Sequence, residues 1–181
     1  MNMMPTLSTE RLILRPFTLD DASELQKLAG ARAIADTTIN IPHPYPEGAA
    51  EKWISTHRNE YQKNGSVAWA VVLKDSPQLI GCISLGVDSK NERAELGYWI
   101  SQTFWGRGYC TEAAKAVLGY GFRQIKLNRI FAFYLSRNPA SGKVMAKIGM
   151  KKEGEMRQHI KKWDQFEDII HYGILAVEYK P

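Results

Sequence analysis

A glycine-rich turn between a strand and a helix is the feature of this sequence that most restricts its fold. Residues 99–117, WISQTFWGRGYCTEAAKAV, end a strand-like run, carry Gly106 and Gly108 in a turn, and begin a helix near residues 109–111. Glycine permits backbone conformations in which successive N–H groups face outward. Together with the positive end of the helix dipole and the cation of Arg107, these donors predict a binding site for a diphosphate.

The place of this turn in the chain argues against two common nucleotide-binding folds. In the Rossmann fold the glycines follow the first strand and are accompanied by a third glycine and a downstream acidic residue. Here four strand-like runs precede Gly106, and the lysine of a Walker motif is absent. The diphosphate site therefore belongs to a different α/β architecture.

The other elements predict a mixed sheet with helices. Strand-like runs occupy residues 11–17, 67–74, 79–86, 93–101, 129–135, 150–160 and 166–177. Helical spacing of apolar residues, or a helix entry such as Asn138 before Pro139, marks residues 22–29, 53–61, 113–125 and 140–148. A polar turn joins the second and third strands, which predicts a hairpin, whereas a helix joins 93–101 to 129–135 and implies a parallel pair. Residues 36–46, with three prolines, and 161–165, KKWDQ, are expected to be connections.

Length and composition predict one globular domain over residues 1–181. The chain is 44% hydrophobic and 24% charged, as in ordinary folded proteins. Its apolar runs are too short to cross a bilayer, and its N-terminus lacks a basic segment followed by an apolar core. We therefore expect a soluble, cytoplasmic protein without a membrane partner. The two cysteines and four histidines show no metal-ligand spacing, so neither a metal nor a disulfide is expected.

The formal charge of +5 favours anionic partners. A phosphate-rich cofactor or an acidic protein would satisfy it as well as a nucleic acid would. Because the basic residues are scattered along the chain instead of gathered in one block, the pattern disfavours nucleic acid.

Three segments in order, ELGYWI, WGRGYCTEA and NPASGKVMAKIGM, resemble the successive acetyl-CoA-binding segments of the GCN5-related N-acetyltransferases. The resemblance runs from RLILRPF to the final strand. It is closest to the branch that contains the ribosomal-protein N-terminal alanine acetyltransferases. It implies an α/β fold with a mixed, largely antiparallel sheet, splayed central parallel strands and about four helices.

The resemblance also assigns cofactor-binding residues, with acetyl-CoA as the acyl donor. It places them on the strand end, the glycine turn and the following short helix: Trp99, Ile100, Ser101, Arg107, Gly108, Tyr109, Cys110, Thr111, Asn138 and Lys143. One position departs from the superfamily, which often has Gln or Arg three residues before the first glycine of the turn, where this chain has Thr103. The departure affects the details of the phosphate contacts.

Acetyl transfer to an amine needs a neutral nucleophile, stabilisation of the oxyanion and a proton for the leaving thiolate. Glu95 lies on the same strand face as Gly97 and Trp99 and is the candidate general base, or else a solvated strand residue. Ser141, in the first turn of the short helix, is the candidate general acid, although serine is common there for structural reasons. The backbone N–H of Ile100 is the candidate oxyanion donor if the strands are splayed.

The resemblance implies direct attack of a primary amine in a ternary complex, and this makes Cys110 a small packing residue instead of a ping-pong nucleophile. The acceptor is expected to be a protein N-terminal α-amine, and an acidic ribosomal protein would suit the basic chain. A polyamine, an amino acid or an aminoglycoside-like amine is the alternative, and a non-catalytic acyl-CoA sensor is a rival. A homodimer is common for this fold. An acceptor pocket is one interpretation of three aromatic residues, Tyr45, Trp53 and Trp163, and core packing is the other.

Overall fold

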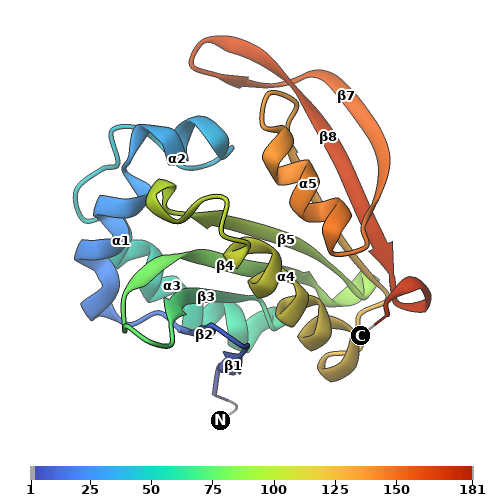
Figure 1. The fold of residues 1–181 in the computed structure, drawn as a ribbon, viewed down its shortest axis with the longest axis horizontal. Coiled ribbons are helices and arrows are strands. Elements are labelled where there is room, and N and C mark those ends of the chain that lie inside the picture. The colour runs from blue at the N-terminus through green and yellow to red at the C-terminus, as the bar shows by residue number, and fades with distance from the viewer. Residues whose placement is uncertain (1–2, 181) are drawn as a thin grey trace.

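The computed structural model describes residues 3–180, which form one eight-stranded sheet with helices on both faces (Figure 1). The strands lie in the order β1-β2-β3-β4-β5-β6-β8-β7. Their bounds are β1 Leu7–Ser8, β2 Leu12–Pro16, β3 Val67–Leu73, β4 Leu79–Asp88, β5 Arg93–Ile100, β6 Arg129–Leu135, β7 Lys151–Lys162 and β8 Gln165–Leu175. Within the described chain, β5 and β6 are the one parallel pair. The expected α/β fold with a mixed, largely antiparallel sheet is confirmed.

The described residues form five α-helices beside the sheet, where about four were expected from the sequence. They are α1 Ala22–Ala29, α2 Arg32–Thr37, α3 Ala49–Asn64, α4 Tyr109–Gly119 and α5 Pro139–Lys147. The additional helix is α2, whose six residues are too short to show a helical repeat in the sequence. Its last turn is held by the Thr37 hydroxyl, which donates to the carbonyl of Ala33 at 2.8 Å.

Two apolar clusters hold the helices against opposite faces of the sheet. The larger one joins the buried side of α4, including Ala114 and Val117, to strand residues such as Leu85 and Ile130. The smaller one packs α1 and α3 on the other face against β3 and β4. The helices therefore cover both faces of the middle strands, and the ends of β5 and β6 lie between the two helical layers.

The parallel strands β5 and β6 diverge after a short common stretch. Their pairing covers three residue pairs, from Arg93 with Arg129 to Glu95 with Phe131, although β5 continues to Ile100. On its other edge β5 stays paired with β4 along its whole length. The splay that the family resemblance implies is thus present, and the far half of β5 presents backbone groups to the gap.

The C-terminal hairpin is longer than its sequence pattern indicates. Strand β7 runs through Lys162, which the sequence places in a connection, and the turn consists of Trp163 and Asp164 alone. Both turn residues have positive φ, 51° and 61°, as a two-residue hairpin turn requires. Figure 1 shows this hairpin rising past α5 toward the side of the molecule that carries α2.

None of the helices formed by residues 3–180 is both long and apolar enough to cross a membrane.

His57 on α3 is expected to make the fold acid-sensitive. The side chain is 3% exposed, packs against Trp53 with ring centroids 4.2 Å apart, and has no hydrogen-bond partner among the described residues. Burial lowers its pKa from 6.5 to about 4. The folded state therefore keeps His57 neutral, while the unfolded chain takes up a proton once the pH falls below 6.5.

We expect the free energy of unfolding to fall between pH 6.5 and pH 4 by up to about 3 kcal/mol from this residue. Urea unfolding of wild type and His57→Leu at pH 7.5 and pH 5 measures the effect. The variant should lose most of the pH dependence, and His159→Gln, at an exposed position on β7, should retain it. Equal pH dependence in His57→Leu and wild type would contradict the assignment.

Candidate functional site

A cavity of about 910 Å³ lies at the splayed end of β5 and β6. Its walls come from α1, α2, the proline-containing segment and α3 on one side, and from the glycine turn, α4 and α5 on the other. Ten of the twelve residues singled out in the sequence line it: Glu95, Trp99, Ile100, Gly108, Tyr109, Cys110, Thr111, Asn138, Ser141 and Lys143. Ser101 and Arg107 are not among the lining residues, and the roles assigned to all twelve stay predictions.

The glycine turn has the backbone geometry that the sequence predicts. Gly106 and Gly108 both lie in the left-handed region, with φ of 76° and 82°, and α4 starts at Tyr109. The first N–H groups of a helix have no partners within it. The first residues of α4 and Lys143 both line the cavity, so it has a helix start and a cation of the kind that a diphosphate needs.

A network between the β1–β2 connection and α4 fixes this turn, and sequence reasoning did not identify it. Glu112 accepts hydrogen bonds from Thr9, from the backbone N–H of Arg11 at 2.8 Å and from Arg11 Nε at 2.7 Å. Arg11 Nη1 also donates to the carbonyl of Arg107 at 3.1 Å. Partial burial opposes ionisation of Glu112, but the hydrogen bonds from Thr9 and Arg11 outweigh it and lower its pKa.

Cys110 is not an activated thiol in this structure. Burial raises the pKa of its thiol to about 12, which is the opposite of the shift that a nucleophilic cysteine requires. The position at the start of a helix therefore does not outweigh the loss of hydration. Cys82, on the other side of the cavity, is also free, and burial raises its pKa to about 12.

Glu95 stands at the last paired position of β5, where β5 and β6 separate. Its side chain is open to solvent at the cavity, yet the surrounding walls remove part of its hydration, and this desolvation raises its pKa. A carboxylate with a raised pKa is a better proton acceptor near neutral pH. Glu95 is also the one acidic side chain among the lining residues, all of which belong to the described chain.

Ser141 is held by a tyrosine that the sequence analysis did not select. The Tyr98 hydroxyl lies 2.8 Å from Ser141 Oγ and donates to the Ser141 carbonyl at 3.0 Å. The bond joins β5 to α5 across the gap between the strands. Burial raises the pKa of Tyr98 strongly, so its phenol stays protonated. Side chains alternate along β5, so Tyr98 lies on the opposite face from Glu95. This alternation is the sequence pattern from which Tyr98 could have been identified.

The backbone N–H of Ile100 faces the gap between β5 and β6. The N–H of the next residue, Ser101, bonds to the carbonyl of Ile80 in β4 at 2.8 Å. Because N–H groups alternate between the two edges of a strand, the Ile100 N–H points to the edge from which β6 has diverged. The Ile100 carbonyl on that edge accepts a hydrogen bond from the indole of Trp105 at 2.5 Å.

The remaining candidates divide between the cavity and its surroundings. Tyr45 and Trp53 line the cavity, whereas Trp163 lies on the hairpin turn outside its lining. The Asn138 side chain faces the cavity but donates to the carbonyl of Thr37 at 3.1 Å, which ties the start of α5 to the end of α2. Among residues 3–180, no cluster of three or more His, Cys, Asp or Glu is placed to hold a metal ion.

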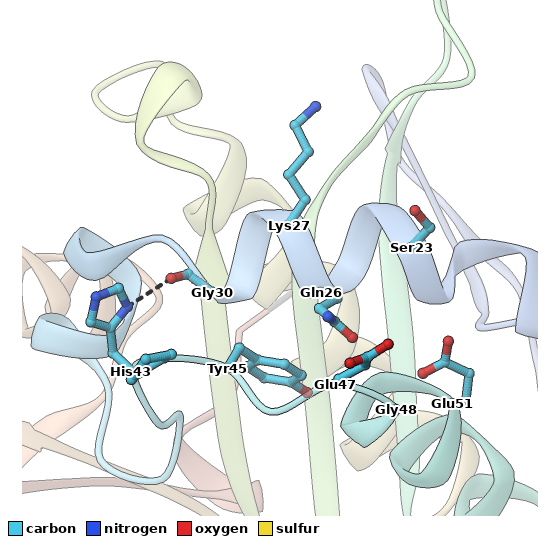
Figure 2. A pocket seen from close by; sticks show the side chains of 10 residues that line it. Ser23, Gln26, Lys27, Gly30, His43, Tyr45, Glu47, Gly48 and Glu51 are labelled. Carbon is cyan, nitrogen blue, oxygen red and sulfur yellow. Dashed lines mark hydrogen bonds between the residues drawn. The ribbon is translucent and has the colours of Figure 1, made fainter.

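A second hollow of about 540 Å³ lies outside this cavity, between α1 and the segment that leads into α3 (Figure 2). Its lining is mostly polar and includes Gln26, Glu47 and Glu51. Figure 2 shows the ring of His43 against the carbonyl of Gly30, a contact of 2.9 Å that holds the segment to the end of α1. The start of α3, at Gly48, also borders this hollow, but two carboxylates, those of Glu47 and Glu51, line it as well and no splayed strand does, so the larger cavity is the candidate active site.

Comparison with known proteins agrees with this geometry. The family model described as acetyltransferase (GNAT) domain matches residues 11–151. An uncharacterized N-acetyltransferase of Bacillus subtilis, YoaA, is 32% identical over 159 residues, which are 87% of this chain and 89% of that protein. The [ribosomal protein uS5]-alanine N-acetyltransferase of Escherichia coli is 28% identical over 77% of this chain and 72% of its own length. A solved GNAT-family acetyltransferase of Bacillus anthracis superposes with a TM-score of 0.85 at 26% identity, over 96% of this chain and 100% of that one.

Proposed function

The chain belongs to the GNAT family of N-acetyltransferases, and we propose that it transfers acetyl from acetyl-CoA to the α-amine of a protein N-terminus. The observation that carries the proposal is the single cavity at the strand splay. The free amides at the start of α4 lie at one part of its wall, and Glu95 lies at another.

The residues of the cavity fit acetyl-CoA as the donor. The positive-φ glycines and the start of α4 suit its diphosphate, and the absence of a side chain at Gly108 leaves this turn open beside Arg11. Acetyl-CoA supplies an acetyl group activated as a thioester. The backbone N–H of Ile100 then donates a hydrogen bond to the acyl oxygen, where negative charge develops during attack.

Two side chains move the protons of the reaction. The acceptor nitrogen forms a bond to the acyl carbon and loses a proton to Glu95, directly or through one water molecule. The carbon–sulfur bond breaks, and Ser141 gives its hydroxyl proton to the departing sulfur and regains one from solvent. The products are the N-acetylated amine and CoA, and the transfer passes through no acyl-enzyme at Cys110.

The lining residues favour an α-amine over a polycation as the acceptor. An α-amine has a pKa near 8 and is partly neutral at physiological pH, so one carboxylate is enough to accept its proton. A polyamine or an aminoglycoside carries several positive charges, and Glu95 alone would face them. The ribosomal-protein N-acetyltransferase among the relatives is consistent with this acceptor.

The test of the proposal is thiol release from acetyl-CoA with a panel of acceptors, together with calorimetric binding of CoA. The panel contains N-terminal peptides, spermidine, free amino acids and an aminoglycoside. Turnover that is at least tenfold more efficient with peptides supports the proposal. Turnover with another amine class alone would mean that this class, and not a protein N-terminus, is the acceptor. CoA binding without single-turnover transfer to any amine would mean that the protein is a non-catalytic acyl-CoA sensor.

Ser141→Ala is expected to lower kcat about tenfold, since thiolate is a moderately good leaving group and needs less help than most. The KM for acetyl-CoA should stay within about twofold, because the hydroxyl acts on the departing sulfur. Tyr98→Phe is the matched variant, as it removes the hydrogen bond to Ser141 and leaves the serine in place. A normal kcat in Ser141→Ala with a large loss in Tyr98→Phe would transfer the acid role to Tyr98.

A further inference from the structure

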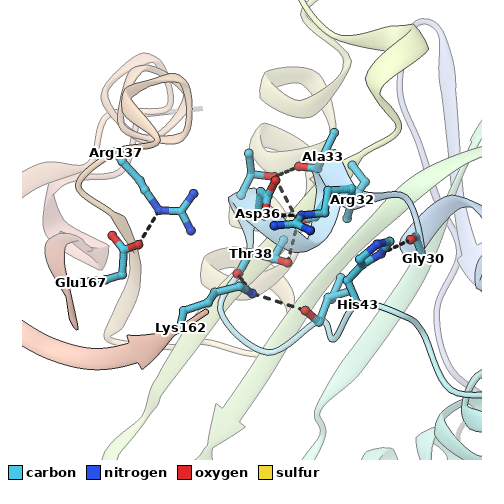
Figure 3. Close-up of polar contacts among 12 residues, drawn as sticks. Gly30, Arg32, Ala33, Asp36, Thr38, His43, Arg137, Lys162 and Glu167 are labelled. Atoms are coloured by element: carbon cyan, nitrogen blue, oxygen red, sulfur yellow. Dashed lines mark hydrogen bonds and ion pairs between the residues drawn. The ribbon is translucent and has the colours of Figure 1, made fainter. Parts of the chain in front are cut away.

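Lys162, near the tip of the C-terminal hairpin, is buried although it carries a charge. Its residue is 8% exposed, and its ammonium donates to three backbone carbonyls, those of Thr38, Ile39 at 3.1 Å and Ile41 at 3.3 Å. Figure 3 shows the side chain extending from the hairpin into the segment that follows α2. No carboxylate within the described residues forms an ion pair with it.

A buried ammonium without a carboxylate is costly unless all its donors are satisfied. Lysine has three N–H donors, and here three carbonyl oxygens accept them. Burial, with a smaller contribution from the charge of Arg137, lowers the pKa of Lys162. The neighbouring cations Arg137 and Arg32 are themselves paired, with Glu167 at 2.7 Å and Asp36 at 3.3 Å (Figure 3).

Trp163 covers the same contact from the turn. The Lys162 ammonium lies 5.2 Å from the centre of its ring, and the Arg32 guanidinium lies 5.1 Å from it. The ring also stands edge-on to His43, with centroids 6.5 Å apart. The hairpin tip therefore contacts the start of the segment that runs from α2 to α3, at Thr38, and its middle, at His43.

The segment that Lys162 holds is a wall of the active-site cavity. Residues 38–41 belong to no helix or strand, and all four line the cavity. Their carbonyls thus have no partners from regular secondary structure, and Lys162 supplies a partner for three of the four from a strand more than 120 residues away in the chain. The preceding carbonyl, that of Thr37, is held by Asn138.

We infer that Lys162 is a positioning residue that fixes the 38–41 wall of the acceptor pocket and so determines which amines fit. The inference rests on the proposed function, since it gives this half of the cavity to the acceptor. The side chains of Ile39 and Ile41 on the fixed wall favour a compact apolar group beside the reacting amine. A wall without its anchor would admit larger groups and bind each of them less well.

Lys162→Met keeps the length of the side chain and removes the three hydrogen bonds. The KM for an acceptor peptide is expected to rise about tenfold, and the preference for alanine over leucine as first residue should shrink, while the KM for acetyl-CoA stays within about twofold. Lys161→Met is the matched control, because Lys161 is exposed and pairs with the exposed Asp164 at 3.0 Å. A general loss of structure would move both KM values together.

Hydrogen–deuterium exchange of the same proteins tests whether Lys162 fixes residues 38–41, and it does not depend on turnover. Peptides that cover residues 38–41 should exchange faster in Lys162→Met than in wild type and Lys161→Met, with unchanged exchange in α4. If Lys162→Met does not fold, Trp163→Ala uncovers the ammonium and should shift exchange and acceptor KM in the same direction.

Unchanged exchange at 38–41, or equal rises in both KM values, overturns the inference. A wild-type enzyme that acetylates no N-terminal peptide defeats the proposed acceptor instead. The exchange experiment then still decides whether Lys162 fixes the wall. The preference for small over large groups beside the amine is then measured within the amine class that the enzyme does accept.

Discussion

Glu95→Gln is expected to lower kcat about 100-fold at pH 7.5, because the amide has the shape of the carboxylate and cannot accept the amine proton. Desolvation raises the pKa of Glu95 above its ordinary value of 4.5. The base works only when ionised, so the wild-type rate should fall on the acid side as the pH drops through that raised pKa. In the variant the fall through the pKa of Glu95 should disappear from the pH profile of kcat/KM, while the fall that protonation of the α-amine causes at about pH 8 should remain.

Glu92→Gln is the control for this experiment. Glu92 stands just before β5 in an exposed turn, and its role there depends on its backbone carbonyl, which accepts the N–H of Asn128 at 2.7 Å. The control should keep the wild-type kcat and the fall through the pKa of Glu95. A Glu95→Gln enzyme that retains both would remove Glu95 from the proton transfer and leave it a solvated strand residue.

Gly108→Ala is expected to weaken CoA binding by about tenfold or more. The residue precedes α4 with φ of 82°, a conformation that costs an alanine roughly 1–2 kcal/mol. Relaxation of the strain would turn the first amides of α4 away from the ligand, and hydrogen bonds to a charged group are among the stronger ones. Isothermal titration with CoA measures the loss.

Gly65→Ala separates the backbone strain from the loss of the ligand. Gly65 ends α3 with φ of 80°, has open space where a β-carbon would stand, and is not among the residues that line the cavity. Both variants should lose similar thermal stability, and only Gly108→Ala should bind CoA weakly. Equal CoA affinity in the two variants would mean that the glycine turn does not hold the diphosphate.

The elements with a clear repeat could be predicted from the sequence, and those that depend on distant contacts could not. Alternation predicted β2, short apolar runs bounded by a polar turn predicted β3 and β4, which are buried on both faces, and helical spacing predicted α4. The helix α2 has too few residues to show such a repeat. The end of β7 was predicted to be part of a connection, because two successive lysines are typical of exposed turns. In the structure, backbone carbonyls of residues 38–41, which lie outside the hairpin, accept hydrogen bonds from the Lys162 ammonium.

The site followed the same division. The glycine turn and Glu95 were recognisable because local sequence fixes a turn, a helix start and a strand face. The Arg11–Glu112 pair and the Tyr98–Ser141 bond join residues 101 and 43 positions apart, and no local pattern announces such contacts. Asn138 was expected to touch the cofactor, and its hydrogen bond to Thr37 shows that a helix-capping residue can also serve the opposite wall. Its contact with the cofactor stays a prediction.

The divergence of β5 and β6 also divides the sheet into two halves that few backbone pairs connect. Strands β1 to β5 lie on one side of the seam and β6 to β8 on the other, and three residue pairs of backbone ladder span it. An acyl donor that binds between β5 and β6 and contacts both halves of the sheet holds the two halves together. Its binding energy then adds directly to the stability of the folded enzyme, by RT ln(1 + [L]/Kd), so that occupancy by the donor also protects the protein from opening along this line.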